Sequence, residues 1–355
     1  MIYRAPGRVN LIGEHTDYNQ GFVLPVALSL DTRIQTSPSP DGSLTAHSAA
    51  RSEAKSWPIS EIPNLTPQHH WSDYIIGVAR ELQTRGIAIQ PLSLHIESTV
   101  PEGAGLSSSA ALEVATALAL LQDCELDRLE IARLCQRAES DFVGMPCGIM
   151  DQYVAIFGRD HAALKIDCRS LESEPVPLPD NVAILAVNSM VKHSLGDSAY
   201  RTRVAECQAA CREIGVASLR DATLEQAQPY KRARHIVTEN QRVQDFVEAS
   251  RANDLARMGQ LFVASHASMR DDYEISCEEI DFLVNTAGNM PGCYGARMTG
   301  GGFGGCTVNL VAPESISVFT KEIRAEYRKT YQIDPQVIPC IPAAGAGKIS
   351  ETNTE

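Results

Sequence analysis

One glycine- and serine-rich segment, 101–111 (PEGAGLSSSAA), constrains the fold of this chain more than any other feature. It follows a predicted strand and opens an apolar helix predicted over 106–121. Its glycines allow backbone conformations that other residues rarely adopt, and they let a ligand approach the main chain. Its serines place hydroxyls and free N–H groups at a helix N-terminus, where the helix dipole favours an anion. A serine N-cap on a buried helix is the simpler alternative, but the combination favours a phosphate-binding loop.

This loop differs from the common nucleotide-binding loops. It lacks the G-x-x-x-x-G-K-[ST] pattern and its lysine, so it is not a P-loop, and it does not match the Rossmann fingerprint. The spacing of the glycines alone therefore leaves the ligand undecided.

Hydrophobic patterning along the chain predicts both helices and strands. Strands are predicted at 32–35, 92–96 and 182–188, and a hairpin at 295–299 and 306–311. Helices are predicted over 71–84, 127–140, 232–252, 255–271 and 316–327. Because strands and helices alternate without the regular rhythm of a doubly wound sheet, we expect an α+β fold.

The length of 355 residues suggests about two domains. The proline-rich segment 171–181 favours an extended, stiff connection and is the candidate junction. We therefore expect an N-terminal domain over 1–175 and a C-terminal domain over 176–345. The small, polar residues from Ala343 onward are expected to fray, with 346–355 as a flexible tail.

Charge and cysteine content narrow the classes of function. The chain has 31 Lys and Arg against 44 Asp and Glu, a net charge of −13. An acidic surface repels phosphate backbones, so we expect no nucleic-acid partner. No stretch has the length of apolar residues that a membrane span needs, and the N-terminus shows no secretory signal. The ten scattered cysteines are typical of a reduced, cytoplasmic protein.

The N-terminal segment 7–19 (GRVNLIGEHTDYN) concentrates polar groups around a short apolar stretch. Arg8, Glu14, His15 and Asp17 are side chains that grip hydroxyls in fixed directions. A solvated loop is an equally good interpretation of this segment by itself. Zinc is disfavoured, because a catalytic zinc usually takes two or three histidines.

Two further segments carry candidate functional residues. Asp151 stands among small and apolar residues in 147–152 (CGIMDQ) and is either an N-cap or a functional acid. Near Arg8 its ionised form would be favoured, and it could then accept a hydroxyl proton or orient that hydroxyl. The segment 298–306 (MTGGGFGGC) has five glycines in six positions, which indicates a close-approach turn, structural or ligand-facing.

Together these segments resemble the signature motifs of the GHMP small-molecule kinases. Segment 7–19 resembles the signature of the branch that phosphorylates galactose, 101–111 resembles the shared ATP motif, and 295–306 resembles the third motif. Three more segments resemble the same branch: 147–152, 165–171 (KIDCRSL) and 270–277 (RDDYEISC). The resemblance runs from about residue 5 to residue 341.

The resemblance implies ATP-dependent phosphorylation of the anomeric C1 hydroxyl of α-D-galactose, giving galactose 1-phosphate and ADP as the first committed step of the Leloir pathway. It implies two α+β domains with the active site in the cleft between them. It also implies Mg²⁺ as a cofactor and a monomer whose partners are the small molecules galactose and ATP.

By position, the resemblance gives each candidate residue a role. Asp151 matches the proposed catalytic base, and Arg8 matches the residue that steadies it and the transferring phosphoryl group. The sugar-binding positions are Arg8, Glu14, His15, Asp17, Gly148, Asp151 and Tyr200. The ATP-binding positions are Gly103, Gly105, Leu106, Ser107, Ser108, Ser109, Trp71 and Tyr74. The magnesium positions are Ser109 and Glu139.

The sequence departs from the family pattern around Tyr200. The family usually shows Tyr-Asn-x-Arg-Arg, whereas this chain has Tyr-Arg-Thr-Arg-Val over 200–204. Two alternatives to galactose phosphorylation remain. One is a related kinase acting on N-acetylgalactosamine or arabinose. The other is a non-catalytic sensor of galactose and ATP, which is disfavoured because Ser109-Ala110, Arg8 and Asp151 are all present.

Overall fold

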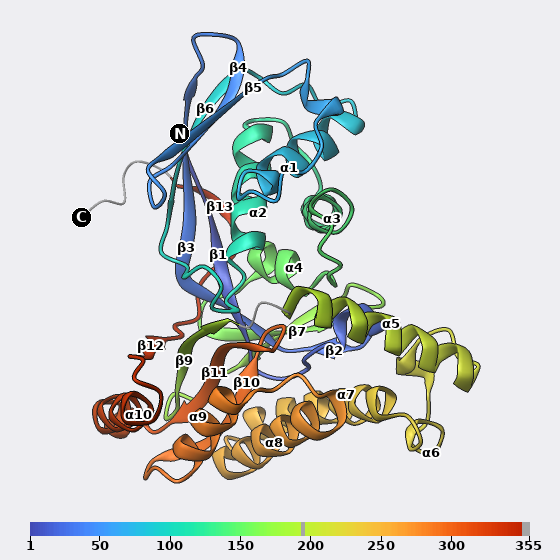
Figure 1. The fold of residues 1–355 in the computed structure, drawn as a ribbon, viewed down its shortest axis with the longest axis vertical. Helices are drawn as coiled ribbons and strands as arrows, with labels where there is room; N and C mark the ends of the chain where they lie inside the picture. Colours follow the sequence, from blue (N-terminus) through green and yellow to red (C-terminus); the bar gives the residue numbers. More distant parts are fainter. Residues whose placement is uncertain (193–195, 350–355) are drawn as a thin grey trace.

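The computed structural model describes residues 1–192 and 196–349, and its elements form an upper and a lower half along the long axis (Figure 1). The strands are β1 Ile2–Asn10, β2 Phe22–Val23, β3 Pro25–Pro38, β4 Ser43–Ser48, β5 Glu53–Pro58, β6 Leu92–Ser98, β7 Ala162–Asp167, β8 Ser173–Pro177, β9 Ala183–Lys192, β10 Cys293–Thr299, β11 Gly304–Val311, β12 Gln336–Pro339 and β13 Gly347–Ile349. The α-helices are α1 Asp73–Thr84, α2 Ser108–Leu121, α3 Arg128–Arg137, α4 Met150–Phe157, α5 Gly196–Ile214, α6 Leu224–Ala227, α7 Lys231–Arg251, α8 Leu255–Ser268, α9 Glu278–Gly288 and α10 Ile316–Tyr331.

The upper half is built on a six-stranded sheet with the order β13-β1-β3-β6-β4-β5. β4 and β6 run parallel, and the other described pairs in this sheet are antiparallel. Helices α1 to α4 lie together on one side of the sheet (Figure 1). Their apolar side chains form one buried cluster with those of β1, β3, β4 and β6, which fixes α2 and α4 against β1.

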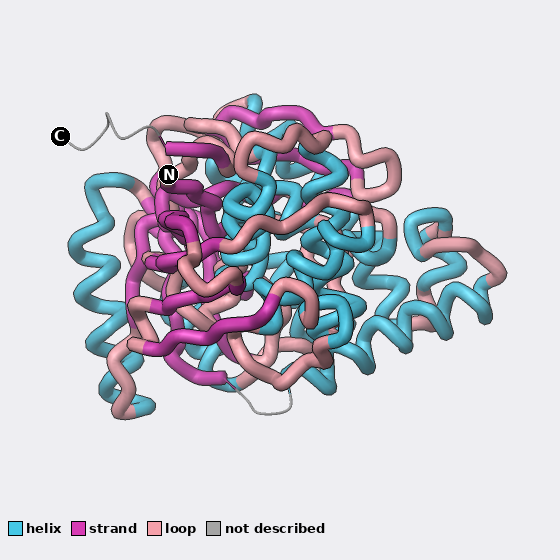
Figure 2. The backbone as a smooth tube through the Cα atoms, turned by 90° about the horizontal axis from the view of Figure 1, so that it is seen from above, coloured by secondary structure: helices cyan, strands magenta, loops and turns pink. Residues whose placement is uncertain are grey.

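The lower half contains a four-stranded antiparallel sheet with the order β10-β11-β9-β12. α7, α8 and α9 lie beneath it, and α10 lies at its far end (Figure 1). Seen from above, the strands gather in one layer with most helices to one side of it (Figure 2). A small third sheet, β2-β7-β8, lies between the halves, and α7 contacts both β2 and β8.

These observations confirm the expected α+β class, since antiparallel sheets and helices are mixed without a doubly wound order. Each predicted helix and strand is present, with shifted ends. α2 begins at Ser108 rather than residue 106, and the helix predicted over 255–271 ends as α8 at Ser268 and continues as a single π-helical turn, Met269–Tyr273.

The proline-rich segment is extended, as predicted, but part of it pairs with β7 as strand β8 rather than acting as a free connection. The predicted division of the chain at residue 175 stays a prediction. The expectation of a frayed C-terminal tail is wrong for 343–349. Ala343 and Ala346 donate backbone hydrogen bonds to Ala27 and Ala155, and Gly347–Ile349 pairs with β1 as strand β13. Residues 350–355 lie outside the described residues.

Candidate active site

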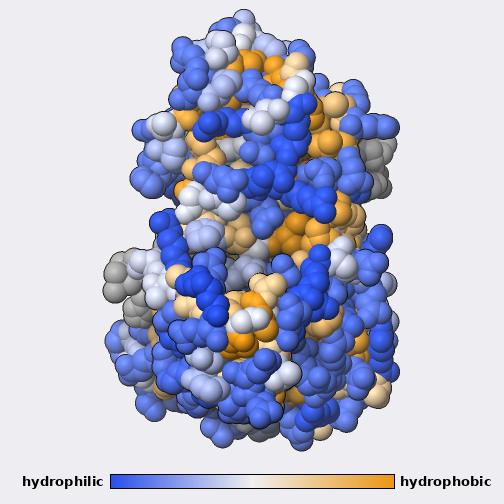
Figure 3. Space-filling model, turned by 90° about the vertical axis from the view of Figure 1, so that its right-hand side faces the viewer, coloured by the Kyte–Doolittle hydropathy of each residue, from blue (hydrophilic) through white to orange (hydrophobic). Residues whose placement is uncertain are grey.

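A cavity of about 730 Å³ lies where the two halves meet. The space-filling view shows the molecule narrowed and hollowed at this level, with hydrophilic and hydrophobic surface side by side (Figure 3). The walls of the cavity come from the loop after β1, the start of α2, the segment before α4, the start of α1 and the β10–β11 turn. The cavity is lined by these residues proposed from sequence: Arg8, Glu14, His15, Asp17, Trp71, Tyr74, Gly103, Gly105, Ser107, Ser108, Ser109, Glu139, Gly148, Asp151 and Tyr200. Leu106 is buried and does not line it; its carbonyl accepts a hydrogen bond from the Arg8 N–H.

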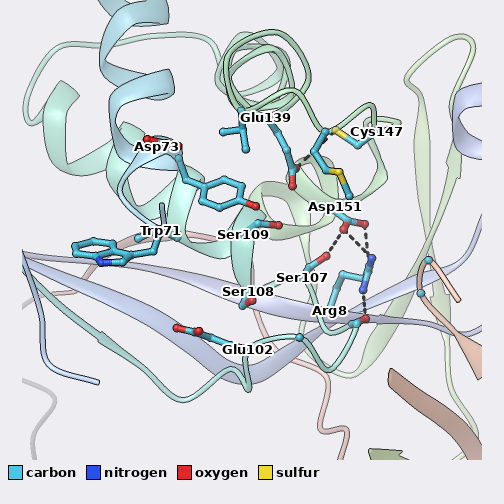
Figure 4. A pocket seen from close by; sticks show the side chains of 18 of the residues that line it. Arg8, Trp71, Asp73, Glu102, Ser107, Ser108, Ser109, Glu139, Cys147 and Asp151 are labelled. Atoms are coloured by element: carbon cyan, nitrogen blue, oxygen red, sulfur yellow. Dashed lines mark hydrogen bonds and ion pairs between the residues drawn. The ribbon is translucent and has the colours of Figure 1, made fainter. Parts of the chain in front are cut away.

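Arg8, on β1, lies at the centre of the site (Figure 4). Its Nε and Nη2 donate to the two carboxylate oxygens of Asp151 at 2.8 and 2.6 Å, a bidentate pair. Its Nη1 donates to the Gly105 carbonyl at 2.6 Å. Ser107 also donates to the Asp151 carboxylate. Arg8 therefore joins the first turn of α4 to the glycine- and serine-rich loop, and it keeps a buried positive charge between them.

The loop before α2 has the conformation that the sequence suggested. Gly103 and Gly105 have φ of 72° and 73°, in the left-handed region that favours glycine. Ser107 also has a positive φ, 60°, which is uncommon for a residue with a side chain. Its hydroxyl contacts Asp151 instead of capping α2. The first-turn N–H groups of α2 consequently have no side-chain cap, so this end of the helix is suited to an anion.

Two groups from the lower half hold the carboxylate of Glu14. One of its oxygens, Oε1, accepts the Gly300 N–H at 3.0 Å and lies 3.2 Å from Arg297 Nη2. Arg297 is fully buried and also donates to the carbonyls of Asn10 and Leu11. The glycine-rich turn thus supplies a backbone donor to the N-terminal loop, and Glu14 has its second oxygen available for other partners.

His15 has a positive φ of 61°, and both of its ring nitrogens are engaged. Nε2 donates to the Gly301 carbonyl at 3.2 Å, because a carbonyl can only accept, and Nδ1 accepts from the Tyr18 hydroxyl at 2.7 Å. Burial lowers the pKa of His15 to about 3, so the ring is neutral at physiological pH. Tyr200 packs against it with ring centroids 5.1 Å apart.

Asp17 is packed directly over Gly148, where any Cβ would overlap its carboxylate. This explains why a glycine stands at residue 148. Burial, and then the negative charge of Asp151, raise the pKa of Asp17 to about 7. The carboxyl groups of Asp17 and Asp151, which have different environments, therefore lie close together at one end of the cavity.

Glu139 lies in the π-helical turn Ala138–Val143 and is buried. Ser109 and Glu139 line the same cavity; burial, followed by the charge of Asp151, raises the pKa of Glu139 to about 7, and the Ser109 hydroxyl acts to lower it. Gln152 Nε2 donates to Glu139 Oε2 at 2.7 Å and to Glu113 Oε2 at 2.9 Å. A hydroxyl and a carboxylate are hard oxygen ligands of the type that Mg²⁺ takes together with substrate phosphates, so this pair fits the ion. No group of three or more His, Cys, Asp or Glu suited to a metal occurs among the described residues.

Trp71 lines the end of the cavity opposite Asp151, and Tyr74 lines the same cavity. Figure 4 shows Trp71 at one end and Cys147 and Asp151 at the other, with the three serines between them. The indole Nε1 of Trp71 donates to Glu53 Oε2 at 3.0 Å, which fixes the ring to β5. The cavity thus runs from an aromatic end, past the helix N-terminus, to a polar end.

Around Tyr200, where the sequence departs from the family pattern, the arginines do not reach the centre of the cavity. Arg201 lines its edge and donates to the Gly144 carbonyl at 2.6 Å. Arg203 donates to the carbonyls of Tyr273 and Glu274 at 2.7 and 2.9 Å. Arg203 therefore holds the end of the π-helical turn Met269–Tyr273 in place.

Sequence reasoning missed several residues that support the site: Glu53, Glu113, Gln152, Arg297, His235 and Glu239. Of these residues, only Glu113 could have been singled out from the sequence, because it is the one charged residue in the apolar helix α2. The others are distant in sequence from the residues they hold, and no local pattern connects them.

Comparisons with known proteins agree with this geometry. Three family models match the chain: "Galactokinase galactose-binding signature" at residues 1–38, "GHMP kinases N terminal domain" at 73–159 and "GHMP kinases C terminal" at 246–328. The galactokinase of Roseiflexus sp. (strain RS-1) is 43% identical, over 99% of this chain and 93% of its own. The galactokinase of Bos taurus is 46% identical, over 93% of this chain and 88% of its own.

Solved structures show the same relationship. The crystal structure of Lactococcus lactis galactokinase complexed with galactose matches with a TM-score of 0.93 and 33% identity, covering 98% of this chain and 95% of that one. A mevalonate kinase structure matches with a TM-score of 0.71 at 19% identity, covering 96% and 99%, and shows the shared fold. The fold and the site thus define the GHMP class of small-molecule kinases, as the sequence motifs predicted. Within that class, the chain belongs to the galactokinase family.

Proposed function

We propose that this protein transfers the terminal phosphoryl group of ATP to the C1 hydroxyl of α-D-galactose, giving galactose 1-phosphate and ADP. The single observation that carries the proposal is the position of Asp151. It lies in the same cavity as the sugar-loop residues Glu14, His15 and Asp17, and it is bonded through Arg8 and Ser107 to the loop at the start of α2.

The polar end of the cavity suits a hexose. Glu14 and Asp17 offer carboxyl oxygens, and the neutral ring of His15 is fixed in one tautomer by Tyr18 and Gly301. Fixed donors and acceptors recognise a pattern of hydroxyls, because each hydroxyl must meet a partner of the right kind. Tyr200 packs on His15 at this end of the cavity. Its apolar ring face suits contact with the C–H face of a sugar.

Asp151 is placed to receive the proton of the attacking hydroxyl. Its Oδ2 already accepts from Arg8 and Ser107, whereas Oδ1 accepts from Arg8 alone. Oδ1 therefore has a further lone pair for the C1 hydroxyl. As the sugar oxygen bonds to phosphorus and the bond to the ADP oxygen breaks, the hydroxyl proton passes to Asp151 and then to solvent. The chain's main contribution is alignment and charge stabilisation, which phosphoryl transfer needs most.

The nucleotide would lie along the rest of the cavity. The backbone N–H groups of 103–109 and the N-terminus of α2 hold its phosphates, and Trp71 and Tyr74 flank its base. Ser109 and Glu139 would hold Mg²⁺, which when bound supplies positive charge to the phosphates. Arg8 supplies a further positive charge next to the reacting groups.

A panel of sugars, with ADP release as the readout, tests the proposal. Galactose should give a higher kcat/KM than N-acetylgalactosamine or arabinose. Faster turnover of either of those sugars would mean that this sugar, and not galactose, is the substrate. Binding of galactose and ATP without ADP release would support a sensor instead.

We also propose that the enzyme is a monomer and that it is located in the cytoplasm. No helix among the described residues has the length and apolar character for crossing a bilayer. The ten cysteines, all within the described part of the chain, are free thiols, which suits a reducing compartment. Light scattering after size-exclusion chromatography tests the monomer, and the expected mass is that of one 38.5 kDa chain.

A further inference from the structure

The loop between β1 and β2 carries three side chains of the cavity but has little regular structure of its own. It contains one short 3₁₀ turn, Asp17–Asn19, and three internal side-chain bonds: from Thr16 to the Gly13 carbonyl, from Asn19 to the His15 carbonyl and from Tyr18 to the His15 ring. Side chains on such a loop keep fixed positions only when its backbone is held by a rigid element.

Helix α7, from the lower half, holds the backbone at both ends of this loop. His235 Nε2 donates to the Glu14 carbonyl at 3.1 Å, and Glu239 Oε1 accepts the Gly13 N–H at 2.9 Å. Asn240 Oδ1 accepts the Phe22 N–H at 2.8 Å. His235 and Glu239 lie one helical turn apart and so share one face of α7. We call His235, Glu239 and Asn240 the α7 anchor.

The anchor is itself held in place by α8. His235 Nδ1 lies 2.9 Å from the Ser268 hydroxyl, and Ser265 donates to Glu239 Oε1 at 2.7 Å. Arg242 donates to the other oxygen of Glu239 at 2.6 Å. His235 and Glu239 are fully buried, and a buried carboxylate is destabilising unless its oxygens are bonded, as they are here. His235 and Glu239 therefore have one well-defined arrangement.

The loop also approaches α7 too closely for ordinary side chains. A Cβ on Gly21 would overlap the Asn240 side chain, and a Cβ on Gly13 would overlap the Phe22 backbone and come within 2.9 Å of Val243. Gly13 has φ of 96°, which independently favours glycine. Two glycines thus allow the loop to contact the helix directly, which makes the backbone bonds to the anchor short.

We propose that His235, Glu239 and Asn240 are positioning residues that set the affinity for the sugar by holding the loop that carries Glu14, His15 and Asp17. The inference rests on the proposed function, because it takes this loop to bind the substrate sugar. The α7 anchor belongs to the lower half, whereas α1 and the loop before α2 belong to the upper half. Loss of an anchor bond should therefore weaken sugar binding and leave ATP binding intact.

Paired substitutions at Asn240 and His235 test the inference. Asn240→Leu removes the acceptor for the Phe22 N–H, and Asn240→Asp keeps it. His235→Leu removes the donor to the Glu14 carbonyl, and His235→Gln keeps an N–H of similar reach. We expect each leucine variant to raise the galactose KM by about tenfold with the ATP KM within about twofold of wild type. Asn240→Asp and His235→Gln should recover part of the loss.

Val247→Ala is the matched control, because Val247 is buried on the same helix two turns beyond Asn240. It should lower Tm without raising the galactose KM. An equal rise in galactose KM in this control, or unchanged galactose KM in both leucine variants, would overturn the inference. If wild-type protein itself fails to phosphorylate galactose, the proposed function fails first. Galactose binding by calorimetry then still decides whether the anchor holds a sugar-binding loop.

Discussion

Arg8 and Asp151, separated by 143 residues in sequence, form a bidentate ion pair with N–O distances of 2.8 and 2.6 Å at the centre of the cavity. Arg8 also reaches the Gly105 carbonyl, so one guanidinium links the carboxylate to the loop before α2. A bidentate pair fixes orientation as well as charge. Under the proposed function, we expect the alignment of the two substrates to depend on this one buried side chain.

Replacing Asp151 with Asn tests its chemical role. The shape and the bond from Ser107 can be retained, but the acceptor of the hydroxyl proton is lost. We expect kcat to fall by about 10²–10⁴-fold, the range typical of removing a general base, while the galactose Kd changes by less than about fivefold. Single-turnover kinetics and calorimetry measure the two quantities. Turnover like that of wild type would mean that Asp151 has a structural role only.

Replacing Ser109 with Ala tests the proposed magnesium pair. The substitution removes the hydroxyl that lines the cavity with Glu139 and leaves the helix N-terminus in place. We expect the KM for Mg-ATP to rise by about tenfold and the galactose KM to stay within about twofold. Titration of Mg²⁺ at fixed nucleotide, followed by the fluorescence of bound nucleotide analogue, gives a second readout. An effect confined to the galactose KM would contradict the placement.

Asp17 gives a prediction about stability and pH. Its pKa is raised from 3.8 to about 7 in the folded protein, so the folded chain binds a proton that the unfolded chain releases between these values. The bound proton therefore makes the folded protein more stable at low pH. This contribution to the free energy of unfolding is lost as the pH rises from about 4 to about 7. Asp17→Asn should raise Tm more at about pH 8 than at about pH 5, and should weaken galactose binding at both. An equal Tm difference at the two pH values would contradict the raised pKa.

Glu113 provides a test of a buried neutral carboxyl. Burial, followed by the charge of Glu139, raises the pKa of Glu113 well above the usual value, so the folded state favours the neutral acid. Glu113→Gln has nearly the same shape and keeps an oxygen for Gln152. It should retain wild-type kcat and show a Tm that falls less than wild type as pH rises towards alkaline values. A loss of stability at neutral pH would show instead that the charge of Glu113 is needed.

Much of this structure could be predicted from local patterns. Segment 101–111 predicted a helix N-terminus suited to an anion, because glycine conformations and free helix N–H groups depend on neighbouring residues only. The hairpin around 300–305 followed from its glycines, and the α+β class followed from the periodicity of the elements. The resemblance to GHMP kinases, now confirmed as family membership, predicted one shared site, and all the candidate residues except Leu106 line one cavity.

The remaining features depend on contacts between distant segments, which local patterns do not encode. The bond between Ser107 and Asp151 and the ion pair of Arg297 with Glu14 join elements that only the tertiary fold brings together. The C-terminal strand Gly347–Ile349 was missed for the same reason. Gly347 and Lys348 have little strand propensity, and the pairing with β1 joins this short segment to the sheet. The α7 anchor is likewise visible only in the structure.

The most direct test of the central claim is phosphorus NMR of the product formed from galactose and Mg-ATP. The proposed function predicts a phosphate on the anomeric oxygen in the α configuration, formed by wild type and nearly absent with Asp151→Asn. A phosphate on another hydroxyl, or equal product from both proteins, would contradict the account.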